Sequence, residues 1–81
     1  MKINVKLFAA LREELDKREF IHELPQGATL GSLVEQLGAQ YPVVRTHLPS
    51  LHFAVNHKYT TLETVLQEGD EVAFLPPVGG G

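Results

Sequence analysis

The chain has 81 residues, of which 43% are hydrophobic and 21% are charged, and this length supports one small domain with little room for an enclosed active site. It contains no cysteine, which excludes a disulfide framework, a thiol nucleophile and thiolate metal ligands. The net charge of −3 and the scattered Lys and Arg residues argue against nucleic acid as a partner.

The N-terminal segment alternates apolar and polar residues, which predicts a strand with one face in the core: Ile3, Val5 and Leu7. Phe8 follows and is expected to point outward. Residues 9–15 are strong helix formers that place Leu11 and Leu15 on one face, so we predict a short first helix closed by residues 17–18. No stretch has the apolar length of a signal peptide or a membrane span, so we expect a cytoplasmic protein with no membrane partner.

The next segment predicts a second strand and the main helix. Residues 19–24 alternate and end at 25–27, a Pro-Gln-Gly turn, and we expect this strand to pair antiparallel with the first. Thr29 is a good N-cap, and an apolar stripe with helical spacing follows it: Leu30, Leu33, Val34 and Leu37. Gly38 is then placed to end the helix.

Residues 39–51 contain two prolines and no sustained period, which predicts a connection with at most a helical turn over 43–47. Alternation over 52–56 predicts a third strand that ends in a turn, and 59–61 predict a short edge strand. Three apolar residues are then spaced to pack a helical turn or loop onto the core: Leu62, Val65 and Leu66. A turn at 68–70 leads into the last strand.

The last strand has Val72 and Phe74 on one face and Ala73 and Leu75 on the other, and the two prolines of 76–77 stop it. The predicted elements follow the order of an α+β, ubiquitin-like β-grasp: strand, strand, long helix, strand, short strand and strand. We therefore predict a mixed sheet of four to five strands with one main helix and a short first helix. The domain would cover residues 1–75, and 76–81 would form a flexible tail.

The tail ends in three glycines, and its only reactive group is the carboxylate of Gly81. Glycines carry no Cβ and pass through a channel too narrow for other side chains. The six residues from Pro76 to Gly81 reach roughly 20 Å when extended, which is enough to enter the active site of another protein. A frayed terminus is the ordinary alternative, but a strand and two prolines directly before the glycines argue against it.

Catalytic side chains are not evident elsewhere. His47, His52 and His57 are spaced five apart, which fits neither a helical stripe nor a strand face, so they are expected to be solvated or capping residues and no metal site is predicted. The carboxylates lie beside a helix or a turn, and the glycines form no phosphate-binding loop. A terminal carboxylate needs activation by ATP, which implies a partner enzyme. Transfer to a persulfide sulfur would give a thiocarboxylate, and transfer to a cysteine and then a lysine would give an isopeptide.

Three segments resemble the small, sulfur-carrying subunit of molybdopterin synthase, the MoaD family. They are residues 7–13 (LFAALRE), residues 54–56 (AVN) and residues 66–81 (LQEGDEVAFLPPVGGG). The similarity runs along the whole chain at the length of that family, and the C-terminal segment is its specific part. Two positions depart from the family pattern: Gly79 stands where a small or polar residue with a side chain is usual, and Leu75 stands where an aromatic residue is frequent.

The resemblance implies a sulfur carrier without a bound cofactor. An E1-like adenylating enzyme would consume ATP to adenylate Gly81, and a sulfur donor enzyme would convert the adenylate to a thiocarboxylate. This group would supply the dithiolene sulfur of molybdopterin to cyclic pyranopterin monophosphate. Gly80, together with Gly79, would give the tail clearance inside the large subunit of the synthase, which supplies the catalytic side chains. Two small subunits would flank a dimer of large subunits in a heterotetramer.

Apolar residues near the root of the tail suggest the surface that meets these partners. Alternation or the prolines place them away from the core, and we predict that they bind partners: Phe8, Tyr59, Leu75, Pro76, Pro77 and Val78. Three rival functions share the fold. They are a sulfur carrier of the thiazole pathway of thiamine synthesis, a ubiquitin-like modifier joined to lysines, and an interaction module with an inert tail.

Overall fold

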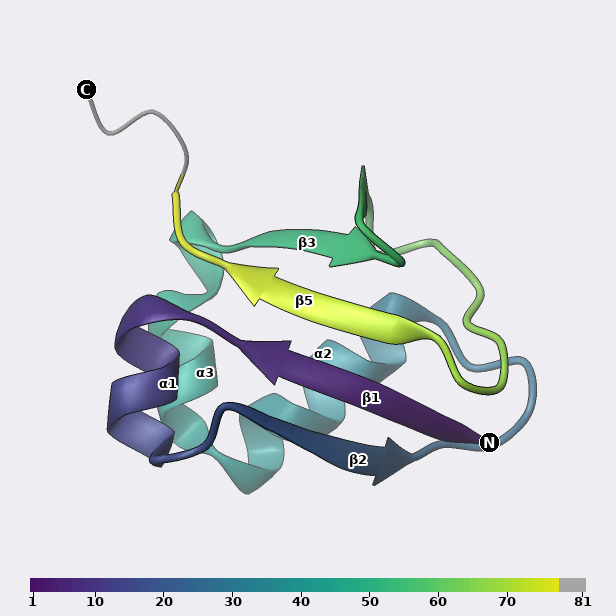
Figure 1. Cartoon of the computed structure of the whole chain (residues 1–81), viewed down its shortest axis with the longest axis horizontal. Helices are drawn as coiled ribbons and strands as arrows, with labels where there is room; N and C mark the ends of the chain where they lie inside the picture. The colour runs from purple at the N-terminus through teal and green to yellow at the C-terminus, as the bar shows by residue number, and fades with distance from the viewer. Residues whose placement is uncertain (78–81) are drawn as a thin grey trace.

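The computed structural model describes residues 1–77, which form one five-stranded sheet with its helices on one face (Figure 1). The strands are β1 (Lys2–Leu7), β2 (Glu19–Glu23), β3 (His52–Val55), β4 (Lys58–Thr60) and β5 (Glu71–Leu75). The helices are α1 (Ala9–Leu15), α2 (Leu30–Gln40) and α3 (Pro42–His47), and a 3-10 turn, η1 (Leu48–Ser50), follows α3.

The strands lie in the order β2-β1-β5-β3-β4. β1 and β5 run parallel at the centre, while β1–β2, β3–β5 and β3–β4 are antiparallel. The sheet is therefore mixed, which confirms the predicted α+β architecture and the antiparallel pairing of the first two strands. The parallel pair consists of the first and last strands and brings the C-terminal end of β5 beside the start of α1 (Figure 1).

The core lies between the sheet and the helices. Alternation points Ile3, Val5 and Leu7 of β1 and Val72 and Phe74 of β5 toward the helices, and all are at most 2% exposed. The predicted stripe of α2 meets them there, and its residues are buried: Leu30, Leu33, Val34 and Leu37. Burial of side chains of this size stabilises the fold by about 1.5–3 kcal/mol each, so the core fixes the position of both central strands.

The main helix begins where predicted but ends later. Thr29 caps it, because its side-chain oxygen accepts a hydrogen bond from the backbone N–H of Ser32 at 3.2 Å. The expectation that Gly38 ends the helix is wrong, since α2 continues to Gln40 and its last cap is Tyr41, directly before Pro42. Gly38 is buried inside the helix, and a Cβ built there would lie 2.9 Å from Cγ of Arg45 in α3. It serves close packing of two helices and not termination.

The segment 39–51 also contains more helix than its prolines suggested. Pro42 occupies the first turn of α3, where a missing N–H costs nothing, and Pro49 lies within η1. At the end of α1, Asp16 adopts the left-handed conformation (φ 54°) and donates its backbone N–H to the carbonyl of Arg12. Asp16 therefore closes this helix together with the predicted Lys17, whose backbone N–H also donates to the carbonyl of Arg12, at 3.3 Å.

The loop before β5 differs from the prediction in its side chains. Leu66 is 1% exposed, but Leu62 and Val65 are 45% and 51% exposed. The backbone of this loop faces α2 instead, because Gly31 donates to the carbonyl of Leu62 at 2.9 Å.

The two residues between β3 and β4, Asn56 and His57, both have positive φ and form the predicted turn. Within residues 1–77, no helix is long and apolar enough to cross a membrane.

Candidate functional site

The C-terminal tail leaves the domain from a strand that is paired on both sides. β5 pairs with β1 on one side and β3 on the other, and Phe74 is fully buried with its ring edge-on to Phe53 at 5.2 Å. The strand ends at Leu75, and Pro76 and Pro77 follow it, exposed. The predicted functional residues beyond this point, Val78, Gly79, Gly80 and Gly81, lie outside the described residues.

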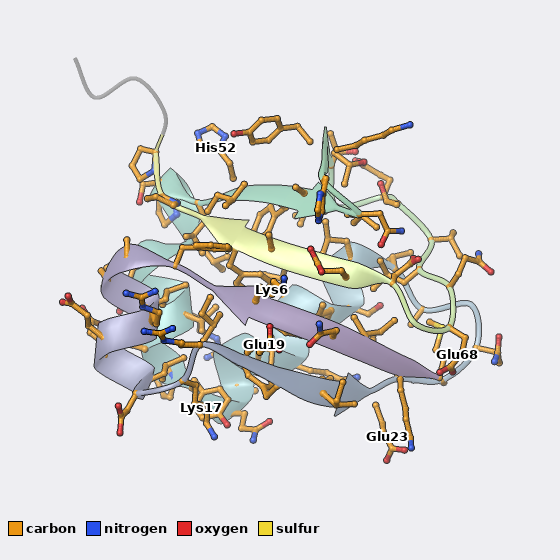
Figure 2. The ribbon with its side chains drawn as sticks, viewed as in Figure 1. Lys6, Lys17, Glu19, Glu23, His52 and Glu68 are labelled. Carbon is orange, nitrogen blue, oxygen red and sulfur yellow. The ribbon has the colours of Figure 1, made fainter. Side chains whose placement is uncertain are left out.

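The sheet face opposite the helices carries an apolar area beside the tail root. Leu75 pairs with His52, whose ring meets that of Tyr59 edge-on with 6.4 Å between centroids. Tyr59 is 66% exposed and pairs with Ala54, which in turn pairs with Ala73. We call these five residues the sheet patch: His52, Ala54, Tyr59, Ala73 and Leu75. His52 marks its position near the end of β5 (Figure 2).

Phe8 belongs to a second, neighbouring surface. It is 39% exposed at the start of α1 and lines a cavity of about 70 Å³ that also has Pro76 and Pro77 in its wall. The remaining lining comes from α1 and from the end of η1: Ala9, Ala10, Leu11, His47, Ser50 and Leu51. We call this hollow the tail-root cavity. The predicted partner-binding residues thus fall into two groups, which join where Leu75 meets Pro76.

Ionic contacts border the sheet patch. Glu71 accepts from Lys6 at 3.2 Å and contacts Nε2 of His57 at 2.9 Å, and Lys6 lies 4.0 Å from Glu19. Lys6 and Glu19 face the viewer across β1 and β2 (Figure 2). The hydrogen bond from Lys6 is the largest cause that lowers the pKa of the Glu71 carboxyl, and the contact with His57 adds to it. Glu71 of β5 therefore contacts both β1, through Lys6, and the turn between β3 and β4, through His57.

Known proteins resemble this chain both in sequence and in fold. A profile of the ThiS family matches residues 5–81. The chain belongs to the ThiS family. Over its full length it is 46% identical to the molybdopterin synthase sulfur carrier subunit of Mycobacterium tuberculosis, of which it covers 99%.

Solved structures place the ThiS-family chain among ubiquitin-like β-grasp proteins, as predicted. One is a putative molybdopterin converting factor subunit 1 from Pyrococcus furiosus (29% identity, TM-score 0.87), which covers 96% of this chain and matches over 99% of its own length. Another is SAMP1 from Haloferax volcanii (26% identity, TM-score 0.88, complete coverage of both chains).

Three of the four histidines of this ThiS-family chain make polar contacts with a neighbouring side chain. His47 meets Glu14 at 3.3 Å, His22 meets Gln36 at 2.9 Å, and His57 meets Glu71. Among residues 1–77 there is no group of three or more His, Asp or Glu side chains placed to hold a metal ion.

Sequence reasoning missed three members of the sheet patch and the tail-root cavity. Ala73 alternates with buried Val72 and Phe74, and His52 and Ala54 alternate with Phe53 and Val55, which pack against the core, so the period of two already placed these three residues on the outer face. Their mutual proximity follows only from the order β5-β3-β4. The cavity joins α1, η1 and the tail root, and no local pattern indicates such a meeting of distant segments.

Proposed function

We propose that this ThiS-family protein is the sulfur carrier subunit of a molybdopterin synthase and works in the cytoplasm. The observation that carries the proposal is the full-length similarity to a relative of that name, together with the Gly79-Gly80-Gly81 end that follows the central strand.

The chemistry would take place at the carboxylate of Gly81. A carboxylate oxygen attacks the α-phosphate of ATP in the adenylating enzyme, and pyrophosphate leaves. A persulfide sulfur of a donor enzyme then attacks the acyl carbon and displaces AMP. A second thiol cleaves the S–S bond, is oxidised to a disulfide, and leaves the thiocarboxylate on Gly81. Delivery of the sulfur to cyclic pyranopterin monophosphate, completed with water, regenerates the carboxylate.

Two surfaces support the association that this cycle requires. The sheet patch presents exposed Tyr59 and half-buried Leu75, and exposed Phe8 lies by the tail root, all away from the core. Aromatic and apolar residues with a polar border are typical of protein interfaces, and Lys6, Glu19 and Glu71 form such a border here. We assign these surfaces to the large subunit of the synthase and, in the loading step, to the E1-like enzyme. A heterotetramer with two carriers remains the expected assembly.

The intact mass of the chain tests the proposal directly. The protein is incubated with the adenylating enzyme of its own organism, ATP and a sulfur donor. Exchange of one oxygen for sulfur at the C-terminus is expected, and the product should convert cyclic pyranopterin monophosphate when the large subunit is added. Lysine conjugates would instead identify a modifier. Sulfur transfer that enters thiazole synthesis would identify the thiamine pathway, and an unchanged mass would refute a loaded carrier.

A variant with one residue added after Gly81 provides the control. The addition moves the terminal carboxylate away from the third glycine and should abolish loading, while the circular dichroism spectrum stays that of the parent. Loading of this variant at the parent rate would show that a free Gly81 carboxylate is not the working group.

A further inference from the structure

The tail-root cavity has no role in the sulfur chemistry, yet it lies where the tail leaves the domain. Pro76 and Pro77 form part of its wall, and only four residues follow them in the chain. A protein that encloses Gly81 reaches the domain through the few residues that follow Pro77, so the cavity is within its reach.

The polar side chains in the cavity wall, those of His47 and Ser50, are already paired. The hydroxyl of Ser50 donates to the carbonyl of His47 at 3.1 Å, and Nε2 of His47 contacts the carboxylate of Glu14 at 3.3 Å. The backbone N–H of Leu51 donates to the carbonyl of Leu48 at 3.1 Å. Because these side chains are paired within the domain, they offer a ligand few hydrogen bonds, and the other side chains of the wall are those of alanine, leucine, phenylalanine and proline. The cavity therefore selects an apolar occupant.

The size of the cavity limits that occupant further. Small-molecule sites span about 300–1,000 Å³, so a volume of about 70 Å³ excludes a nucleotide or a pterin. An apolar cavity of about 150 Å³ accepts benzene, and this one is half as large. The end of one aliphatic side chain, such as that of leucine, isoleucine or methionine, matches it better than an aromatic ring does.

We infer that the tail-root cavity receives one aliphatic side chain from the large subunit of the synthase when that subunit takes up the tail. The inference rests on the proposed function. The large subunit is chosen over the adenylating enzyme because a lasting subunit contact gains most from a buried apolar side chain. The contact would add affinity and also fix the direction in which the tail leaves Pro77.

Filling the cavity from within tests the inference. Ala10 lines it from α1 and is otherwise exposed, so Ala10→Leu occupies the space without disturbing the core. Ala39→Leu is the matched control, because Ala39 is also an exposed helical alanine but lies on α2, outside the cavity. Titration calorimetry with the large subunit of the same organism should show affinity at least about tenfold lower for Ala10→Leu and unchanged for Ala39→Leu.

A second measurement reports the occupant without a mutation. In a complex of methyl-labelled chain with unlabelled large subunit, the methyl groups of Leu51 should show nuclear Overhauser effects to aliphatic protons of the partner. Leu62, exposed in the loop beside α2, should show none. Equal affinities for both variants, or contacts of Leu51 only with aromatic protons, would overturn the inference while the carrier function stands. Failure of the parent chain to bind the large subunit at all would refute the proposed function itself.

Discussion

At the scale of single residues, the carboxyl of Glu71 makes the free energy of unfolding depend on pH. Hydrogen bonds from Lys6 and from His57 lower the pKa of its carboxyl below the usual 4.5. A lowered folded-state pKa stabilises the fold when the group is ionised, so the contribution is complete above 4.5 and is lost as the pH falls through the folded value. Glu71→Gln should therefore lower the free energy of unfolding at pH 7, and the difference from the parent should shrink below pH 4.5.

Urea unfolding of both proteins at neutral and acidic pH measures this difference. Glu35→Gln, at an exposed position of α2, is the control and should show a smaller effect at neutral pH. A difference between parent and Glu71→Gln that is the same at both pH values would contradict the assigned role of Glu71. Added salt should also reduce it, because the contacts lie at the surface.

A substitution of Phe8 should weaken partner binding while it leaves the free energy of unfolding nearly unchanged. It is the N-cap of α1, with an extended backbone (φ −133°, ψ 158°) and no side-chain cap. Aspartate is a favourable N-cap and carries a charge suited to a helix N-terminus, so Phe8→Asp should change the free energy of unfolding by less than about 1 kcal/mol. The same charge beside the tail-root cavity should weaken binding of the large subunit by at least about tenfold, measured by calorimetry.

Ile21→Asp is the matched comparison for Phe8→Asp. Ile21 is 58% exposed on β2, at the far edge of the sheet from the sheet patch, so this variant should bind as the parent does. Unchanged binding of Phe8→Asp would remove Phe8 from the interface. A loss shared by both variants would indicate a general effect of charge.

At the scale of elements, local sequence patterns predicted the strands and helices whose buried face carries apolar residues at a regular spacing. The alternation of β1 and the stripe of α2 are visible in the sequence, because a core-facing element repeats its apolar residues. Pro42–His47 and Leu48–Ser50 are too short to show a period, and Pro42 and Pro49 suggested loop. The prediction that Leu62 and Val65 pack onto the core was wrong for another reason. Hydrogen bonds from α2 residues hold the backbone of their loop against α2, so the two side chains face outward.

The contact between α2 and α3 explains why a glycine stands inside a helix. Gly38→Ala should gain about 1 kcal/mol of helix propensity, but its Cβ would displace the Arg45 side chain, 2.9 Å away. We expect the single change to be nearly neutral, and the same change in an Arg45→Ala background to stabilise the protein by about 1 kcal/mol. Thermal unfolding of the double-mutant cycle measures both values. A full gain from Gly38→Ala alone would show that Arg45 does not restrict this position.

At the scale of the whole molecule, the first and last strands of the chain, β1 and β5, pair side by side in the sheet. The sequence predicted that both are strands with a buried face, but their parallel pairing depends on contacts that span the length of the chain. The same pairing places Phe8, at the end of β1, near Pro76, at the end of β5. The candidate docking surfaces are therefore a product of topology, and single elements could not reveal them.

Because β5 is enclosed by β1 and β3, the tail root should come loose only when the whole domain unfolds. Native-state hydrogen exchange tests this. Amides of Val72 and Phe74, both fully buried, should exchange with the free energy of global unfolding, whereas amides of the short edge strand β4 should exchange through smaller openings. Urea should accelerate the β5 amides with the global m-value and leave the β4 amides nearly insensitive at low concentration. If β5 opened locally, with protection well below that of β1, the domain could not present Pro77 to a partner at a fixed place.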